Sequence, residues 1–572
     1  MRYSRIAQAL QEISQAPRSQ KVDLAADLLA EIKPEPDMLC PAVRLLLGEL
    51  WPPWEDREMG IGPEALMAAL AEVSDLDVSL QRERMVEMGM VAEAALGQKG
   101  QHSLFCEPLE ALSVYESLRR ISSISGKESE QRKIALLRGL FLEATPLEGK
   151  YIARTALRNM QVGIGHMTMI AALSLALHCD QEKIRQAYSL MPDLGSIAAM
   201  ARSRKLESVA IRPKVPTRNM LFRSSEPTVP GAFLPKYPGL RVQVHKIKNE
   251  VRIFTSQLRN ITFALNGISQ LLGEIGSDFV ADADLIGFYD TGINNNNNSH
   301  NIYFNNIGSN NTNSNDASCN HPGPKEDGTK RKGICSQAEM LRYINRRRLS
   351  RKSSIHPALL AYDLITLEGK DICSMPYQDR RKRLLSILGE PKNMPFSGIS
   401  LAQEAILKDR EAVDEFLCRT GKAGARALLE RDLQATYRPG EVSERDFIIR
   451  AEHNLAALIV RVVWGSGKKE KLPARYQVAL RSGEQLVPVG WAWRGLPKRD
   501  QMALSHRLKS LVRDEDESGA DVTAQVVLNL KIKGAHKRGK KYSILEPVIE
   551  GVRLNASPED ADELERLEKI YH

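Results

Sequence analysis

The first two hundred or so residues carry hydrophobic positions at helical spacing. Leu24, Leu28, Leu29 and Ile32 recur at such intervals, and the block from Tyr151 to His178 repeats the pattern. This spacing places apolar side chains on one face of a helix. The pattern therefore predicts an all-helical region from residue 1 to about residue 212.

One short run interrupts this periodicity, Gln161-Val162-Gly163-Ile164-Gly165. Its two glycines allow a tight chain reversal and a close approach of the backbone to phosphate groups. A plain turn between two helices is the simpler interpretation of the same residues. The run alone leaves both interpretations open.

After the helical region the chain changes to short alternating segments. Prolines at the run Ile211-Arg212-Pro213-Lys214-Val215-Pro216 mark an extended linker. Valines at positions 242 and 244 then alternate with polar residues, which is typical of a strand with one buried face. We predict a mixed α and β domain whose first strands are Arg241–Lys246, Val251–Thr255 and Phe279–Phe288.

Short strands return after about residue 451 and enclose one helix. The predicted strands are Leu455–Trp464, Tyr476–Leu480, Leu486–Trp493 and Ala524–Ile532, and the predicted helix is Asp500–Val512. This succession is typical of a small barrel of the OB type. Ser557 as N-cap and Pro558 in the first turn predict a closing helix.

Composition limits the class of protein. The chain has 572 residues, of which 42% are hydrophobic and 26% charged, so several domains of ordinary globular type are expected. Its apolar runs are shorter than the roughly 18 residues that span a bilayer, and we expect no membrane association. The start MRYSRIAQALQEI is charged and helical in pattern, unlike a signal peptide. Seven scattered cysteines without metal-ligand spacing indicate free thiols in a reducing cytoplasm.

Basic residues outnumber acidic ones and are clustered. Lys and Arg total 80 and Asp and Glu total 71, which gives a formal net charge of +9. Three regions concentrate the positive charge: Arg202–Arg218, Arg346–Lys352 and Lys531–Lys541. They either line one surface that follows nucleic-acid phosphates or form three unrelated solvated faces.

Residues 291–331 differ from the rest of the chain. They contain a run of asparagines from Asn294 to Asn298, followed by further Asn, Ser, Gly and His with few apolar residues. Such a segment cannot bury enough surface to offset its ordering entropy. We predict a disordered surface loop inserted between two elements of the middle domain.

Lys236 stands where the first strand of the middle domain is predicted to begin, in the run FLPKYPGLRVQVHK. A lysine held at a strand end can act as a nucleophile once its amine is neutral. Lysines beside turns are also common as solvated side chains. The run alone supports either interpretation.

Several stretches resemble the ATP-dependent DNA ligases of the archaeal and eukaryotic type. PLEGKYIARTALRNMQVGIG is similar to the DNA-binding domain of that family, and RVQVHKIKNEVRIFTSQLRNIT to the strands after its nucleophile. AYDLITLEGKDICSMPYQDRRKRL is similar to its Phe-Asp-x-Leu…Pro-Tyr-x-x-Arg-Arg segment, and SPEDADELERLEKIY to its closing helix. The resemblance covers nearly the whole chain apart from the Asn-rich insert.

The resemblance implies a multidomain α+β fold. It implies an all-helical DNA-binding domain at 1–212, a nucleotidyltransferase-like α/β adenylation domain at 213–452 with the insert at 291–331, and a C-terminal OB-fold barrel at 453–572. Ligases of this family transfer AMP from ATP to a lysine, pass it to the 5′-phosphate of a nick and then join the 3′-hydroxyl. The implied cofactors are ATP and Mg²⁺ (or Mn²⁺), and the implied partner is nicked duplex DNA.

The same resemblance gives expectations about cellular role. Family members act in DNA replication, repair and recombination. The resemblance also implies a monomer in the cytoplasm, with a sliding clamp as a candidate protein partner.

The roles of the family transfer to particular residues of this chain. Its adenylated lysine falls on Lys236, and its nucleotide-binding positions fall on Arg241, Asp284, Tyr362 and Arg450. Asp284 also stands at the metal-binding position, and Tyr362 at the position of the aromatic residue that stacks on the base. The DNA-binding role falls on the glycines at 163 and 165.

Other positions of the family pattern are replaced. Leu234, Pro238 and Ser256 stand where the family has Glu, Asp and Arg. Arg426 takes the place of a Glu, Ile448 that of the first clamp lysine, and Leu545-Glu546-Pro547-Val548 that of the Arg-Phe-Pro-Arg signature. Removing one such cation or donor costs about 10²–10³ in rate.

Two hypotheses follow from this mixture of retained and replaced residues. One is an ATP-dependent DNA ligase with an impaired active site. The other is a catalytically inactive relative that acts as a DNA-binding or replication and repair partner protein.

Overall fold

The computed structural model describes most of the chain. It describes residues 1–572 except 56, 76, 80, 81, 83, 84, 86, 100–106, 290–332, 346–353, 393–397, 466–471, 517, 518, 539, 540, 571 and 572. The predicted disordered loop at 291–331 and the basic cluster Arg346–Lys352 therefore lie outside the described residues.

The N-terminal part is helical, as predicted. Its helices are α1 (Tyr3–Gln15), α2 (Lys21–Ile32), α3 (Pro36–Leu47), α4 (Pro63–Ala71), α6 (Met88–Leu96), α7 (Ala111–Ser123), α8 (Ser129–Glu143), α9 (Pro146–Ala156), α10 (His166–Leu177), α11 (Gln181–Leu190) and α12 (Leu194–Arg202). Their buried apolar faces form one cluster that runs from Tyr3 to Val209. Local sequence sets the start of α9, where the backbone N–H of Thr145 donates to Glu148 and the Thr145 hydroxyl accepts from the Glu148 backbone.

The middle part consists of sheets covered by helices. One sheet has the strand order β4-β3-β5-β6-β7 with β8 beside β6, and another has the order β1-β11-β10-β2-β9. The strands of the first are β3 (Leu240–Ile247), β4 (Glu250–Thr255), β5 (Phe279–Tyr289), β6 (Ile355–Leu367), β7 (Lys370–Asp371) and β8 (Gly398–Leu401). Those of the second are β1 (Leu221–Ser224), β2 (Gly231–Lys236), β9 (Ala405–Leu407), β10 (Ala427–Arg431) and β11 (Val442–Ile449). The helices are α13 (Asn266–Gly273), α14 (Gln337–Ile344), α15 (Tyr377–Leu388) and α16 (Arg410–Lys422).

Strand β3 differs from its prediction, because it is buried on both faces. Val242 and Val244 are fully buried, as expected, but so are the alternating polar residues Gln243 and His245. The Gln243 amide accepts a hydrogen bond from the backbone of Thr217 and donates to its hydroxyl, both at 2.9 Å, so the proline-marked linker covers this face. Burial lowers the pKa of His245 to about 3, which keeps this imidazole neutral.

The C-terminal part forms a curled antiparallel sheet of the predicted OB type. Its order is β14-β13-β12-β16-β15, with β17 beside β12 and β20. The strands of this sheet are β12 (His453–Trp464), β13 (Pro473–Ser482), β14 (Gln485–Ala492), β15 (Val512–Asp516), β16 (Gly519–Val522), β17 (Val527–Ile532) and β20 (Val548–Arg553). Strands β18 (Ala535–Arg538) and β19 (Lys541–Ile544) pair with each other in a separate two-stranded sheet. The helices are α17 (Lys498–Lys509) and α18 (Leu564–Ile570).

Two element boundaries in this part were predicted incorrectly. Helix α17 ends at Lys509, and Val512 already begins β15. Ser557 does not cap the closing helix. It precedes a 3-10 turn, Pro558–Asp560, and its backbone N–H donates to Asp560 at 2.7 Å. The chain then extends before α18 begins, so the acidic residues that suggested one helix serve a separate turn.

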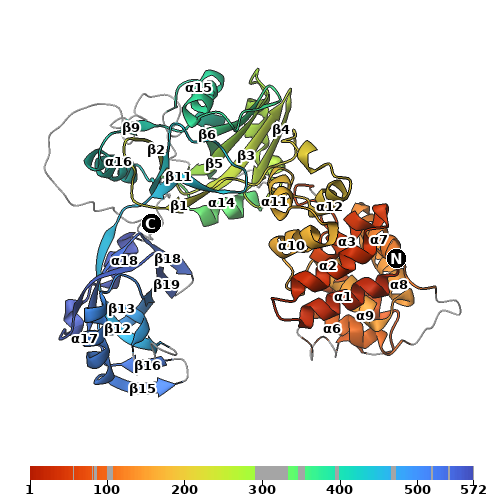
Figure 1. The fold of residues 1–572 in the computed structure, drawn as a ribbon, viewed down its shortest axis with the longest axis horizontal. Coiled ribbons are helices and arrows are strands. Elements are labelled where there is room, and N and C mark those ends of the chain that lie inside the picture. Colours follow the sequence, from red (N-terminus) through yellow and green to blue (C-terminus); the bar gives the residue numbers. More distant parts are fainter. Residues whose placement is uncertain are drawn as a thin grey trace.

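The three parts form an open arrangement. Figure 1 shows the helical part and the C-terminal part both joined to the middle part and lying apart from each other. The backbone N–H of Arg218 donates to Ser189 at 2.8 Å on the helical side, and Lys533 pairs with Glu226 at 3.7 Å on the other. Buried hydrophobic clusters fall separately into each part. We propose domain boundaries at 212/213 and 452/453.

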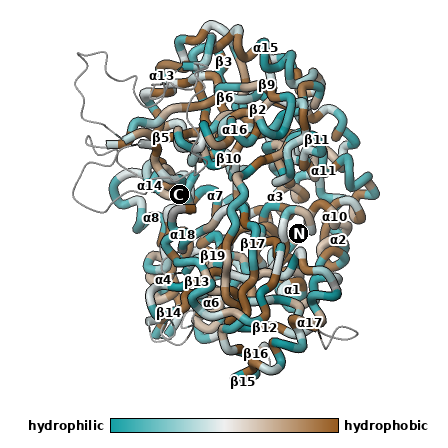
Figure 2. Tube along the Cα trace, turned by 90° about the vertical axis from the view of Figure 1, so that its left-hand side faces the viewer, coloured by the Kyte–Doolittle hydropathy of each residue, from teal (hydrophilic) through white to brown (hydrophobic). Residues whose placement is uncertain are grey.

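Hydrophobic stretches in the chain are short. Figure 2 shows hydrophobic and hydrophilic residues intermixed along the helices and strands. None of the helices within the described ranges is long and apolar enough to cross a membrane.

Candidate active site

Lys236 is the last residue of β2, at the edge where the two sheets of the middle part meet. Strand β2 is held between β10 and β9, and Ala427 stands opposite Lys236 in the ladder. The backbone N–H of Arg426 donates to the Lys236 carbonyl at 2.8 Å, which closes the strand end. Gly239 then allows the turn into β3, because a Cβ there would lie 2.5 Å from the Leu285 carbonyl oxygen. These contacts fix the backbone from which the lysine extends.

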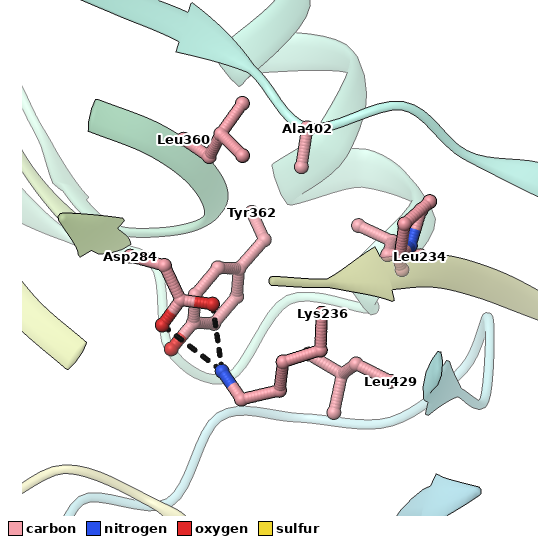
Figure 3. A pocket seen from close by; sticks show the side chains of 8 residues that line it. Leu234, Lys236, Asp284, Leu360, Tyr362, Ala402 and Leu429 are labelled. Atoms are coloured by element: carbon pink, nitrogen blue, oxygen red, sulfur yellow. Dashed lines mark hydrogen bonds and ion pairs between the residues drawn. The ribbon is translucent and has the colours of Figure 1, made fainter. Parts of the chain in front are cut away.

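The Lys236 side chain reaches across to β5 and meets Asp284. Its Nζ lies 2.9 Å from Oδ1 and 2.7 Å from Oδ2. Figure 3 marks both contacts with dashed lines. The lysine side chain is 25% exposed and the carboxylate 10%, so the pair is open to solvent from the lysine side. The ammonium also lies 5.5 Å from the centre of the Tyr362 ring. Sequence-predicted residues from three strands therefore meet at one point.

Apolar residues form the rest of the pocket. Besides Lys236, Asp284 and Tyr362 its lining consists of Leu234, Pro235, Leu360, Ala402 and Leu429. The space is about 240 Å³ and includes volume open to solvent. The part of this space that a water-sized sphere could occupy is only about 10 Å³, whereas small-molecule sites usually measure about 300–1,000 Å³. A nucleotide would therefore enter only after the side chains around Lys236 move.

A second carboxylate, Asp282, lies two residues before Asp284 on β5 and is fully buried. Because side chains alternate along a strand, Asp282 and Asp284 face the same side of β5. Asp282 accepts hydrogen bonds from the hydroxyls of Tyr362 and Tyr437, both at 2.9 Å, and from the Asn219 amide at 3.3 Å. It ties β5, β6, the linker and the loop before β11 together.

Arg241 also pairs with Asp282. Its Nε donates to Asp282 at 3.0 Å, Nη2 pairs with the same carboxylate, and Nη1 donates to the Met220 carbonyl at 2.6 Å. Burial would lower the pKa of this guanidinium, but the attraction of Asp282 raises it well above its ordinary value. Arg241 thus lies beside the pocket with each of its nitrogens already bonded.

The Tyr362 ring forms one wall of the pocket (Figure 3), and its hydroxyl donates a hydrogen bond to Asp282. The residue is only 3% exposed, and burial raises the pKa of its phenol well above the ordinary value. The guanidinium of Arg241 lies 5.8 Å from the ring centre, so the ring is flanked by two cations. The hydrogen bond to Asp282 fixes the orientation of the ring, and the ring lines the pocket.

Sequence reasoning missed a second buried cluster next to Tyr362. Asp363 bonds Arg380 Nε and Nη2 at 2.8 and 3.0 Å, and Arg431 Nη2 at 2.5 Å, with all three side chains fully buried. Burial would raise the pKa of Asp363, but the two guanidinium groups lower it to about 2. Arg431 also lies 4.2 Å from the Tyr377 ring centre. Asp363 and Arg380 both stand in the segment AYDLITLEGKDICSMPYQDRRKRL, but its local sequence does not show that they pair, because only the fold brings them together with Arg431.

Among the replaced positions of the motif, Leu234 lines this pocket and the others lie outside its lining. Ile448, at the first clamp position, pairs with Leu429 in the β10–β11 ladder and joins the apolar cluster around Leu234. Arg450, the second clamp position, follows β11 and lies 3.7 Å from Glu546 of the C-terminal part. At the position of the Arg-Phe-Pro-Arg signature, this chain therefore places the carboxylate of Glu546 beside Arg450.

The two predicted DNA-binding glycines lie elsewhere, between α9 and α10. Gly163 has φ +74°, a conformation that favours glycine, and a Cβ there would lie 2.8 Å from Lys21 Nζ. Gly165 is the N-cap of α10 and has open space where a Cβ would point. The run forms the helix–helix turn of the simpler interpretation, and a role in binding DNA stays a prediction.

Metal-binding capacity at the pocket is limited to one carboxylate. Among the described residues there is no group of three or more His, Cys, Asp or Glu side chains that could hold a metal ion. Mg²⁺ is commonly held by one or two carboxylates together with substrate phosphates. Asp284 therefore fits an ion that arrives with a nucleotide, and does not fit a site made by protein alone.

Family models match two segments of the chain. Residues 2–174 match the model described as DNA ligase N terminus, and residues 230–447 match the ATP dependent DNA ligase domain. Together they span more than half of the sequence.

Relatives match over the full length. A DNA ligase of Thermococcus fumicolans is 26% identical and covers 100% of this chain and 98% of its own, and one of Methanosphaera stadtmanae is 25% identical with 99% and 98% covered. Among solved structures, the ligase domain of LigD from M. tuberculosis is 16% identical, with a TM-score of 0.30 over 60% of this chain and 97% of its own.

Proposed function

Because the chain belongs to the family of ATP-dependent DNA ligases, we propose that it seals nicks in duplex DNA through an AMP group carried on Lys236. The observation that carries the proposal is the position of Lys236. Its Nζ lies at a rigid strand end, partly open to solvent, between the carboxylate of Asp284 and the ring of Tyr362. This is the placement that a lysine nucleophile needs for attack on a bound nucleotide.

In the proposed first step Lys236 attacks the α-phosphorus of ATP. The ammonium must first lose a proton and separate from Asp284, after which the nitrogen forms a bond to phosphorus and the bond to pyrophosphate breaks. AMP then passes to the 5′-phosphate of the nick, and the 3′-hydroxyl displaces it. Tyr362 would stack on the base, because its ring faces the pocket and its hydroxyl is fixed by Asp282.

A divalent ion fits beside Asp284, where it would supply positive charge to the phosphates. We propose Mg²⁺ for this position, with Mn²⁺ as a substitute. Arg241 would act by holding Asp282, and through it the Tyr362 ring, since its nitrogens are already bonded. Arg450 is the proposed remaining contact to the leaving pyrophosphate.

The alternative function is a catalytically inactive relative that binds DNA. The pocket favours it in one respect, because Ile448 places hydrocarbon at the position of the first clamp lysine, which would stabilise phosphates, and packs there with Leu234 and Leu429. Glu546 in addition presents negative charge to Arg450. Preorganised cations are usually the largest contribution to phosphoryl transfer, so their loss predicts slow adenylation.

The deciding experiment measures the intact mass of the protein after incubation with ATP and Mg²⁺ or Mn²⁺. We expect an AMP-sized increase that Lys236→Ala abolishes. Lys248→Ala is the matched control, because Lys248 is an exposed lysine just past the other end of β3 and should leave the increase intact. An increase that survives Lys236→Ala would show that another residue carries the AMP.

A nick that already carries AMP on its 5′-phosphate separates the two functions. Its sealing does not need the pyrophosphate contacts, so we expect it to be faster than sealing from ATP. If neither substrate is joined at high enzyme concentration while nicked DNA still binds, the inactive relative is the correct function.

Binding of nicked duplex DNA is expected under either function. Each phosphate contact made by Lys or Arg releases counterions, so affinity should fall steeply between low and moderate salt. A flat salt response would contradict both functions.

We further propose that the protein acts as a monomer in the cytoplasm, with a sliding clamp as a candidate partner. Size-exclusion chromatography with light scattering tests whether it is a monomer.

A further inference from the structure

The C-terminal barrel carries exposed tryptophan on the face formed by its second and third strands. In the β13–β14 ladder Tyr476 stands opposite Ala492, and both are buried. The next pair, Gln477 opposite Trp491, points to the other side because side chains alternate along a strand. Trp493 follows β14 and is 48% exposed. Tryptophan usually buries most of its large apolar surface, so this exposure is unusual.

Guanidinium groups lie over this exposed ring. The Cζ of Arg475, on the neighbouring strand β13, is 5.8 Å from the Trp493 ring centre, and that of Arg494 is 5.9 Å away. Both arginines are exposed. We call these residues, Arg475, Trp491, Trp493 and Arg494, the tryptophan face. It combines flat aromatic surface with positive charge, without being packed into the core.

Trp464 in the same barrel shows what a core-packed tryptophan looks like. The Nζ of Lys509 lies 5.8 Å from its ring centre, a cation contact much like those of Trp493. Trp464, however, is partly buried and packs against the hydrophobic core of the barrel. The contact with a cation is therefore not what distinguishes Trp493. The distinguishing feature is that its ring remains accessible to a ligand.

We propose that the tryptophan face binds single-stranded DNA, with unpaired bases stacked on Trp493 and Trp491 and phosphates beside Arg475 and Arg494. OB-type barrels bind oligonucleotides on the face of strands 2 and 3, which here are β13 and β14. Bases stack on aromatic rings without regard to sequence, and arginines follow the backbone. The negative charge of the strand complements the arginines of the face. This site is separate from the pocket at Lys236 and does not depend on ligation.

The experiment measures binding of a labelled oligo(dT) probe of about 12 nucleotides, a length within OB-fold site sizes, by fluorescence anisotropy at low salt. Trp493→Ala should raise the Kd about 10-fold, whereas Trp493→Phe should keep most of the affinity. Arg475→Ala and Arg494→Ala should each lower the slope of log K against log salt by about 0.7. Arg461→Ala is the control, because this cation of β12 is paired with Asp516 and Asp521, both at 2.6 Å.

The circular dichroism melting curve of each variant checks that the barrel is folded, and Lys236→Ala should bind oligo(dT) normally. Quenching of tryptophan fluorescence by unlabelled oligo(dT) gives a second readout, which should weaken in Trp493→Phe even though affinity is kept. Failure of the wild type to bind oligo(dT), or an unchanged Kd in folded Trp493→Ala, would overturn the proposal. Loss of AMP transfer would leave it untouched.

Discussion

The ion pair at Lys236 and the ion cluster at Asp363 lie in the same domain but are built in opposite ways. Asp363 is fully buried and bonded by two equally buried arginines, so water reaches none of the three side chains. Lys236 has a single carboxylate partner and a side chain that is 25% exposed. A buried cluster that water does not reach can only hold the fold together. A pair that is open on one side can separate when a ligand arrives.

Asp282 stands between these extremes. It is as buried as Asp363, but its partners include Tyr362, whose ring faces the pocket. Its role is therefore to hold a ligand-facing group in place while touching no ligand itself. The domain thus has two buried, fixed clusters, which are formed by Asp282 and Asp363 with their partners. We call these the fixed layer, and we call Lys236 and Asp284, which are partly open to solvent, the pocket mouth.

The largest effect should come from breaking the Asp363 cluster. Asp363→Ala leaves the buried guanidinium of Arg380 without a carboxylate and that of Arg431 with only Asp446 at 3.3 Å, and breaking a buried pair in this way typically costs about 3–5 kcal/mol of unfolding free energy. Asp379→Ala is the control on helix α15, because the Asp379 carboxylate makes an exposed ion pair with Lys382 at 3.7 Å and no other ion pair among the described residues. An equal effect of the two substitutions would contradict the division into a fixed layer and an open mouth.

The readout must report on the middle domain itself. The tryptophans at positions 51, 54, 464, 491 and 493 all lie outside residues 213–452, so their fluorescence does not follow its unfolding. Hydrogen exchange of peptides from α15 and β10, measured by mass spectrometry, gives the local free energy.

At the mouth the substitution Asp284→Asn should act on chemistry and leave stability nearly unchanged. Lys236 can be hydrated when it loses its partner, because its side chain is already partly exposed. Adenylation should fall about 10²–10³-fold, the usual cost of one charged group in such a site. The rate of AMP attachment is measured beside the exchange protection of β5. Asp414→Asn, which alters an exposed pair with Arg410, should change neither.

The sequence predicted the residues of the pocket mouth better than the buried contacts of the fixed layer. Lys236, Asp284 and Tyr362 were each assigned from a local motif, and the fold brings them together. The partners of Asp282 could not be found in this way, since Tyr437 lies 155 positions away. The alternation in β3 likewise predicted a solvent-facing side, and only the tertiary packing of the linker around Thr217 buries it. Local patterns do not record such long-range contacts.

Glu430 sharpens the comparison, because it is a buried carboxyl on β10 that faces away from the Asp363 cluster and has no cation partner among the described residues. One oxygen accepts the Thr228 backbone N–H at 3.0 Å, and the other finds no partner among the described residues. Burial raises the pKa of Glu430 to about 7, with Asp446 and Asp432 adding to the rise and the Thr228 N–H opposing it. The side chain is therefore protonated in the folded state near pH 6 and ionised above pH 7.

This shift makes stability fall as pH rises. In the unfolded chain the carboxyl ionises near its ordinary pKa of 4.5, so the folded state binds more protons between about pH 4.5 and 7 and loses stability across that window. Glu430→Gln should remove this dependence and raise the unfolding free energy at pH 8 by about 1–3 kcal/mol. Exchange protection of β10 at pH 5 and pH 8 measures it. A pH response that is identical in wild type and variant would assign the effect to another group.

The smallest effect is expected at Arg450 and Glu546, where the comparison reaches the C-terminal part. The two side chains are 32% and 49% exposed and 3.7 Å apart, so their ion pair should be worth only about 0.2–1 kcal/mol and should be screened by salt. Glu546→Gln is therefore expected to leave the fold intact while releasing Arg450 toward a bound phosphate. Adenylation should become modestly faster at low salt, and the gain should shrink as salt also releases Arg450 in the wild type. Slower adenylation in Glu546→Gln would mean that the carboxylate holds Arg450 in its working position.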